Sequence, residues 1–243
     1  MHLADGARDY RKGFPSCLLG NFICCAPISC YYARNSTHSG SGWIMQLSDI
    51  QEDTLYFNRT NMFTVLDMQR KDADKAINAI NPDALLNAPT DDLIEDIVDK
   101  YKLEVPILLR DDVHLDPPRE ITLTIQDYGR TIHPTGTLLT LHVPFTGDAG
   151  MFWVQPSTYD SGPPRGMLNG QELILRMRGT NLEPTAVEKH FNSTLDDFER
   201  YLNWQRTSAD QFLTELTQRA RQTIEARKAR LLADREHGRQ PSV

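Results

Sequence analysis

Four short segments between Glu120 and Arg178 constrain the fold more than any other part of the chain, because apolar and polar residues alternate along them. The segments read ITLTI, TLLTLHV, MFWV and ELILRMR, and turn residues such as Asn169-Gly170 separate them. A period of two is typical of strands with one buried face. Strands at intervals of roughly ten to fifteen residues favour an antiparallel, sandwich-like sheet over a βαβ unit. We therefore predict an antiparallel β core over residues 105–180.

Helical periodicity precedes this core. Apolar residues recur at helical spacing from Asp67 to Ile80, where Asn81-Pro82 closes the pattern. A second helix is predicted after Pro89, with Thr90 as its N-cap and an apolar stripe along one face. The opposite face carries acidic residues, which an ordinary solvated helix surface explains without a binding site.

Two helical stripes follow the core. One runs from Val187 to Leu202, the other runs from Phe212 to Leu231, and the pattern breaks near Trp204. Ser208 and Gln211 form a capping-box pattern at this break, so we expect a hairpin of two helices packed against the sheet. The sequence thus predicts the α+β class, with an antiparallel β-sandwich-like core flanked by N-terminal helices and a C-terminal helical hairpin.

These patterns divide the chain into five segments. They are an extension foreign to the fold (1–44), an acidic helical segment (45–104), the β core (105–180), the helical hairpin (181–237) and a tail (238–243). The extension holds an uncharged run over residues 14–33, so an export signal or membrane anchor is the alternative to a natural start at Met45. Prolines and a glycine interrupt the run. We therefore expect a cytoplasmic protein without membrane contact.

Cofactor-binding and nucleophile motifs are missing from the sequence. It contains no G-x-G-x-x-G, no P-loop and no G-x-S-x-G. The four cysteines lie in the extension at a spacing that does not match paired zinc ligands, namely Cys17, Cys24, Cys25 and Cys30. We predict no cofactor, and we interpret the cysteines as part of a segment foreign to the fold.

The formal charge of −7 is distributed unevenly. Residues 45–110 hold 7 basic and 13 acidic side chains (7 − 13 = −6), whereas residues 219–239 hold 7 basic and 3 acidic ones (7 − 3 = +4). Nucleic-acid contact through the basic helix 219–235 is one interpretation. The other is a solvated face or a surface that packs against an acidic neighbour, and the interspersed acidic residues and the low overall charge favour it.

Asp112, His114 and Asp116 are the sharpest candidate site. Residues at i, i+2 and i+4 share one face if the backbone is extended. Carboxylates and an imidazole in this arrangement are suitable ligands for a divalent cation. Pro117-Pro118 ends the stretch at once, however, and the same three residues would suit a solvated sheet edge or turn.

A second candidate is an acid–base site near the turns of the β core. Its members would be His133, His142 and Asp148, with Ser157 or Thr158 as the nucleophile. Nothing in their spacing selects them, because a catalytic triad is defined by geometry and not by sequence position.

Three runs carry a family resemblance, and they are VPILLRDDVHLDPPREITLTI (105–125), VPFTGDAGMFWVQPSTYDSGPPRG (143–166) and HFNSTLDDFERYLNWQRTSADQF (190–212). They resemble the N-terminal module of uncharacterised bacterial proteins, over about residues 45–235. The resemblance implies a C-terminal restriction-endonuclease-like domain in the relatives, with an acidic metal-binding core. That domain is absent from this sequence, so no nuclease residue is carried over and we expect a truncated form.

Together these observations predict a non-catalytic interaction or regulatory module. Its expected partner is another protein or the missing nuclease-like domain, and any nucleic-acid contact would come through that domain or the basic helix 219–235. The first alternative is a small metal-dependent hydrolase that uses Asp112, His114 and Asp116. The second is an exported or membrane-anchored protein, which depends on residues 14–33.

Overall fold

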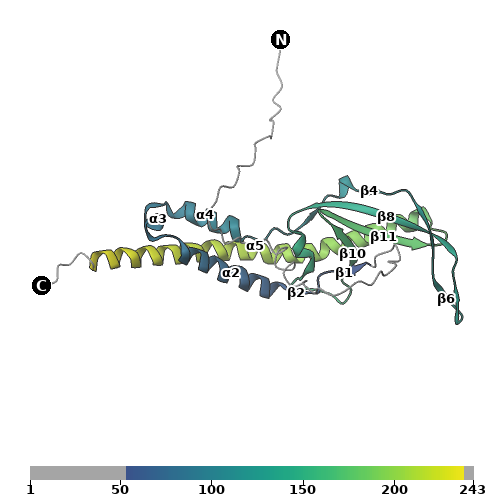
Figure 1. The fold of residues 1–243 in the computed structure, drawn as a ribbon, viewed down its shortest axis with the longest axis horizontal. Helices are drawn as coiled ribbons and strands as arrows, with labels where there is room; N and C mark the ends of the chain where they lie inside the picture. The colour runs from purple at the N-terminus through teal and green to yellow at the C-terminus, as the bar shows by residue number, and fades with distance from the viewer. Residues whose placement is uncertain (1–52, 238–243) are drawn as a thin grey trace, which may run out of the picture.

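The computed structural model describes residues 53–237, which form an α+β fold drawn out along one long helix (Figure 1). The predicted fold class is therefore confirmed. The predictions for residues 1–44, including the cysteines, the uncharged run and the start at Met45, lie outside the described residues. The predicted tail 238–243 lies outside them as well.

One antiparallel sheet of seven strands forms the β core. In spatial order its strands are β1 (Thr54–Leu55), β10 (Arg165–Asn169), β11 (Glu172–Gly179), β8 (Thr135–Thr146) and β3 (Ile107–Leu108), with β4 (His114–Leu115) and β5 (Arg119–Thr122) also paired to β8. One edge of β8 pairs with β11, and its other edge carries β3, β4 and β5 in succession. The predicted sandwich is corrected to this single main sheet, because its inner face packs on a helix instead of a second sheet.

Two small sheets lie outside the main one. In the first, β2 (Thr60–Asn61) pairs in parallel with β9 (Val154–Gln155). In the second, β6 (Ile125–Asp127) pairs with β7 (Arg130–Ile132), so the predicted strand ITLTI is divided between β5 and β6.

The predicted strand MFWV is wrong. Residues Ala149–Trp153 form a 3-10 helix, η2, and β9 begins only at Val154. Asp148 causes the turn, because its Oδ1 accepts a hydrogen bond from the Gly150 N–H at 2.8 Å. The apolar pattern of MFWV did not reveal the 3-10 helix. The adjacent residues Met151 and Phe152 are both buried in it, whereas a half-buried strand buries every second residue.

The two predicted N-terminal helices are confirmed, with different ends. They are α2 (Met62–Ala79) and α4 (Thr90–Tyr101), and the short α3 (Pro82–Asn87) lies between them. The Asn61 side chain caps α2, since its Oδ1 accepts from Thr64 N at 2.8 Å. Pro89, and not the predicted Thr90, occupies the N-cap position of α4.

The predicted C-terminal hairpin is wrong, because Pro184–His237 form one continuous helix of 54 residues, α5. Ser208 and its neighbour Thr207 suggested a new helix start. Their hydroxyls instead donate hydrogen bonds to carbonyl oxygens four residues earlier, Thr207 to Asn203 (3.1 Å) and Ser208 to Trp204 (3.4 Å). Serine and threonine side chains make this bond inside helices as well as capping them. The change of pattern near Trp204 marks a change in what α5 packs against.

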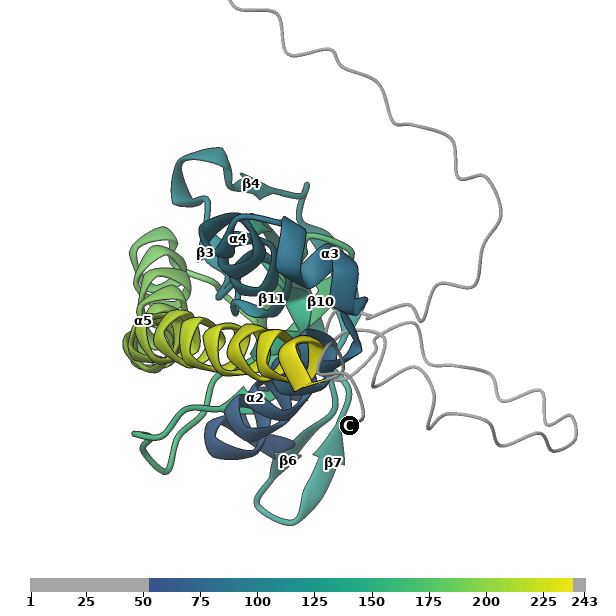
Figure 2. The ribbon, with the colours of Figure 1, turned by 90° about the vertical axis from the view of Figure 1, so that its left-hand side faces the viewer.

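α5 passes through two hydrophobic cores (Figures 1 and 2). Its first half packs under the main sheet through Phe191, Leu195, Phe198, Tyr201, Leu202 and Ala209. Its second half packs against α2, α3 and α4 through Phe212, Leu216, Ala220 and Ile224. Leu66 and Leu103 contact both cores, so the two cores adjoin.

The basic second half of α5 lies along the acidic helical segment. Four ion pairs join them, Arg70–Glu215, Arg219–Asp74, Arg221–Asp91 and Arg235–Asp83. In three of these pairs the opposite charges noted in the sequence meet within the molecule, and Arg70–Glu215 has the reverse polarity. Nucleic-acid contact through residues 219–235 stays a prediction. Across residues 53–237, no helix combines the length and the apolar character needed to cross a membrane.

Candidate functional site

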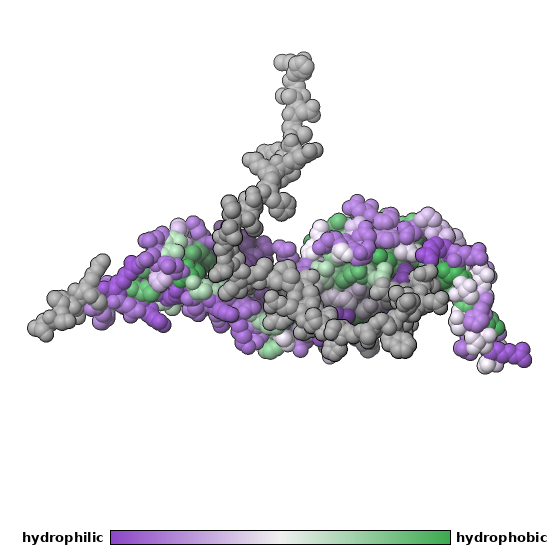
Figure 3. Space-filling model, viewed as in Figure 1, coloured by the Kyte–Doolittle hydropathy of each residue, from purple (hydrophilic) through white to green (hydrophobic). Residues whose placement is uncertain are grey.

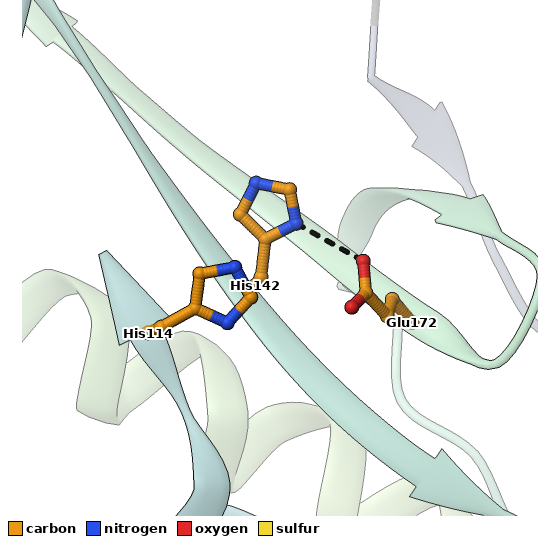
Figure 4. Close-up of side chains that lie close together, drawn as sticks. All are labelled: His114, His142 and Glu172. Atoms are coloured by element: carbon orange, nitrogen blue, oxygen red, sulfur yellow. Dashed lines mark hydrogen bonds and ion pairs between the residues drawn. The ribbon is translucent and has the colours of Figure 1, made fainter. Parts of the chain in front are cut away.

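A cluster of histidine and carboxylate side chains lies on the outer face of the main sheet (Figure 4). Leu141 and Val143 of β8 point into the core, so His142 between them points to the opposite face. His114 of β4 pairs directly with His142, and β11 brings Glu172 beside them from the other edge of β8. Three strands that are far apart in the sequence thereby build one site.

His142 is the centre of this cluster. Its Nδ1 lies 3.2 Å from Glu172 Oε2, and its Nε2 lies 3.1 Å from Asp116 Oδ2. The His114 ring stacks on the His142 ring, with centroids 4.5 Å apart and planes inclined by 10°. The His142 side chain is 17% exposed, whereas its partners Asp116 and Glu172 are 48% and 36% exposed.

Two opposing effects act on the pKa of His142. Burial lowers it, whereas the hydrogen bonds and the charges of Glu172 and Asp116 raise it. The carboxylates prevail, and the pKa lies above the ordinary histidine value. An imidazolium donates to both carboxylates, while a neutral ring has a single N–H and donates to one. The cluster is therefore an environment that favours positive charge.

The fold divides the predicted trio of Asp112, His114 and Asp116. Asp112 ends the 3-10 helix η1 (Arg110–Asp112), so it lacks the extended backbone that the prediction assumed. His114 and Asp116 both contact His142. Metal binding by the trio stays a prediction, and the group of potential ligands that the structure assembles is His114, His142 and Glu172.

The predicted acid–base set has its members in separate local contacts. His133 Nδ1 lies 3.4 Å from Thr124 Oγ1, next to the β6–β7 sheet. Asp148 caps η2. His142 belongs to the cluster on the main sheet, and Thr158 is exposed in the loop between β9 and β10. The structure therefore gives this set no common site.

Sequence reasoning missed Glu172 and, with it, the position of His142 between two carboxylates. The Asn169-Gly170 turn predicted the strand that begins at Glu172 but not the neighbour of that strand. A period of two shows which residues of a strand share a face, while the strand that lies beside it depends on the whole topology.

The β6–β7 sheet forms a second feature, the projecting hairpin (residues 123–134), which extends away from the end of the main sheet (Figure 1). Ile125 and Ile132 pair across it on one face and are 38% and 42% exposed. Gln126 and Thr131 pair on the other face, where Gln126 Nε2 donates to Thr131 Oγ1 at 2.8 Å. The hairpin thus has an apolar face and a polar face, and Figure 3 shows apolar surface along it.

Tyr128 forms the tip of the projecting hairpin. Its φ is +45° and that of Gly129 is +79°, the pair of positive values that a type I′ turn requires. Asn or Gly fits the first of these positions, whereas a bulky side chain is strained there. The Tyr128 side chain is nevertheless fully exposed. No described residue offsets this strain by packing against the ring.

Comparison with known proteins identifies no family for this chain. No protein-family model, no curated protein and no solved structure matches it. The resemblance to nuclease-associated bacterial modules therefore stays a prediction, and the inferences below are based on the geometry of the chain itself.

Proposed function

We propose that this chain is a non-catalytic interaction module that docks onto a protein partner through the projecting hairpin. Tyr128 supports the proposal most directly, because its ring is fully exposed on a residue with a φ of +45°. The left-handed conformation costs a residue of this kind about 1–2 kcal/mol. Burial of the ring in a partner would offset that cost.

The remainder of the projecting hairpin supports the same function. An isolated two-stranded hairpin is at best marginally stable in water. Ile125 and Ile132 form an apolar face that remains 38% and 42% exposed. Aromatic anchors buried at the centre of an interface commonly supply most of its binding energy, and their neighbours exclude water.

The chemistry of the tip indicates what the partner presents. Asp127 and Arg130 pair across the hairpin beside Tyr128, so a matching surface has an apolar pocket with both charges at its rim. A nuclease-like domain of the kind that the resemblance implies is one candidate partner. Docking through the tip would hold it at a fixed place relative to the main sheet.

Site-specific photo-crosslinking in cells that naturally make the protein would test this function. A photoreactive phenylalanine in place of Tyr128 should yield a discrete adduct, which mass spectrometry identifies. The same probe in place of Thr158, which is exposed in a loop outside the hairpin, is the matched control. Ile125→Asp with Ile132→Asp should remove the adduct at 128, because it charges the apolar face. Equal adducts at both probe positions, or an adduct that survives the two substitutions, would contradict docking through the hairpin.

A metal-dependent hydrolase is the second candidate function, because His114 and Asp116 adjoin His142 and Glu172. The purified full chain would be supplied with zinc or manganese and with phosphodiester, phosphomonoester and peptide substrates. We expect no metal-dependent turnover. Hydrolysis by the parent chain that is lost in His142→Ala would show that the chain is an enzyme and would contradict the proposal of a non-catalytic interaction module.

A further inference from the structure

We infer that His114, His142 and Glu172 bind one divalent transition-metal ion, with zinc as the ion that fits best. Two imidazoles and a carboxylate are a ligand set typical of zinc and its first-row neighbours. One ligand atom from each residue lies within 4.8 Å of the others, and all three side chains meet on the outer face of the main sheet (Figure 4). The site is separate from the projecting hairpin and does not depend on the proposed function.

The spacing of the two closest ligand atoms suits a tetrahedral ion. His142 Nδ1 and Glu172 Oε2 are 3.2 Å apart. Zinc bonds of about 2.0–2.2 Å at a tetrahedral angle place two ligand atoms roughly 3.3 Å apart. An ion therefore fits between them with little movement. His114 is exposed, so its ring can turn toward the same point without repacking the core.

Asp116 provides the support that a metal-bound histidine needs. Histidine ligands almost always donate their other ring N–H to a carboxylate, a carbonyl oxygen or water, which fixes the tautomer and orients the ring. Asp116 Oδ2 lies in that place, 3.1 Å from His142 Nε2. We assign Asp116 as a positioning residue that acts through His142 and not as a ligand.

An ion at this site would join three strands. His114 belongs to β4, which is two residues long and lies at one edge of β8, while Glu172 comes from β11 at the opposite edge. Three protein ligands leave at least one tetrahedral position open for water or for a side chain of another molecule. The ion would thus link β4 and β11 across β8, with its open coordination position facing away from the core.

Isothermal titration with zinc tests the site on the full chain, with Cys17, Cys24, Cys25 and Cys30 replaced by serine in every protein. This replacement removes competing thiolates. We expect one zinc ion bound at the site and a higher unfolding temperature in its presence. His142→Ala should abolish this binding, and His114→Ala and Glu172→Gln should weaken it more than tenfold. Asp116→Asn should weaken it about tenfold. A large excess of Mg²⁺ should not displace zinc, because imidazole ligands suit zinc and not magnesium.

Asp112→Ala and His133→Ala are the matched controls, since both residues are exposed and lie outside the cluster. Their zinc affinity should stay within about twofold of that of the parent chain. Zinc binding that is unchanged in both His114→Ala and Glu172→Gln would overturn the inference. So would a parent chain that binds no more zinc than His142→Ala. His114→Ala alters an exposed side chain and remains decisive if His142→Ala fails to fold.

Discussion

Gln205 is a buried polar residue that fastens α5 to the irregular edge of the β core. It is fully buried, and its Nε2 donates hydrogen bonds to the carbonyl oxygens of Met151 (2.8 Å) and Val154 (2.5 Å). These carbonyls lie where η2 gives way to β9. The glutamine amide thus supplies a buried donor to two main-chain carbonyl oxygens at this irregular edge.

Gln205→Glu should destabilise the fold at neutral pH. The substitution removes the donor and places a buried carboxylate against two carbonyl oxygens, which costs roughly 3 kcal/mol or more. Urea denaturation would measure the loss. Gln218→Glu, on the exposed face of the same helix, is the matched control and should change little. Equal denaturation midpoints for the two variants would contradict this account.

Tyr201 and Asp160 make stability depend on pH. The Tyr201 hydroxyl donates to Asp160 Oδ1 at 2.5 Å. This hydrogen bond is the largest of the effects that hold the pKa of Asp160 below its ordinary value. Burial and then Asp160 raise the pKa of Tyr201 to about 12, so the hydroxyl remains a donor across the working range. A depressed carboxyl pKa stabilises the fold above its ordinary value of 3.8, and this stabilisation is lost as pH falls through the lowered value.

Tyr201→Phe should therefore cost stability at neutral pH and cost progressively less in acid. Urea unfolding of both proteins across a pH series would measure the difference, which should narrow below about pH 4, where Asp160 protonates in the unfolded chain. Tyr159→Phe, at a largely exposed residue, is the control. A difference that does not vary with pH would show that the carboxylate is not involved.

Local spacing brought together part of the histidine and carboxylate cluster on the main sheet and not the rest. His114 and Asp116 share a face of one extended segment, and a period of two shows this directly. Glu172 enters through the pairing of residues 172–179 with residues 137–144, which depends on strand order and register. Asp112 was misplaced because the 3-10 turn that contains it leaves no distinct signal in the sequence.

At the scale of elements, the continuity of α5 can be tested with a single proline. In a hairpin with a helix start at Ser208, Asp210 would lie in the first turn, where proline is tolerated. In the continuous helix Asp210 is interior and exposed, so Asp210→Pro should destabilise the fold by about 3 kcal/mol or more. Thermal unfolding followed by circular dichroism would measure it, with Asp210→Ala as the control. A proline variant as stable as the alanine variant would support the hairpin.

A substitution at the tip of the projecting hairpin should affect the stability of the fold and the affinity for the partner differently. Tyr128→Asn places asparagine before Gly129, the pair that a type I′ turn prefers. We expect stability to be unchanged or to rise by a few tenths of a kcal/mol, since the strain is relieved and no packing is lost. The variant should nevertheless lose affinity for the captured partner in a direct binding assay. Clear destabilisation would mean that the ring stabilises the fold itself.

Elements with an uninterrupted period were predictable, and elements defined by side-chain contacts at a distance were not. The alternation in β8 and β11 and the stripes of α2 and α4 follow from which face is buried. η2 replaced a strand because Asp148 and Gln205 hold its backbone. The hydroxyls of Thr207 and Ser208 resembled a helix start because the same groups bond inside a helix.

For the whole molecule, we expect the two cores to unfold together. They adjoin, and α5 runs through both. Leu173→Ala in the first core and Leu216→Ala in the second should each lower stability by about 2–5 kcal/mol, because both side chains are almost fully buried. Calorimetry should show one transition that moves as a unit in either variant. A transition that splits in two would mean that each core folds on its own.

The α+β class was readable because it depends on local patterns. The joining of the two cores by one helix was not, since the break near Trp204 has the same composition whether the helix turns back or continues. The charge distribution held a further clue. Packing of the basic helix against an acidic neighbour was one of the alternatives, and the structure identifies the acidic helical segment as such a neighbour, for example where Arg219 pairs with Asp74.

The continuity of α5 also has a mechanical consequence. At a rise of 1.5 Å per residue its 54 residues span about 80 Å, and the projecting hairpin and α3 lie near opposite ends of the longest axis of the molecule (Figure 1). Because this single helix packs against both cores, it fixes the position of one core relative to the other. A partner that binds the hairpin tip would therefore find α3 and its neighbours α2 and α4 at a defined distance and orientation from its binding site.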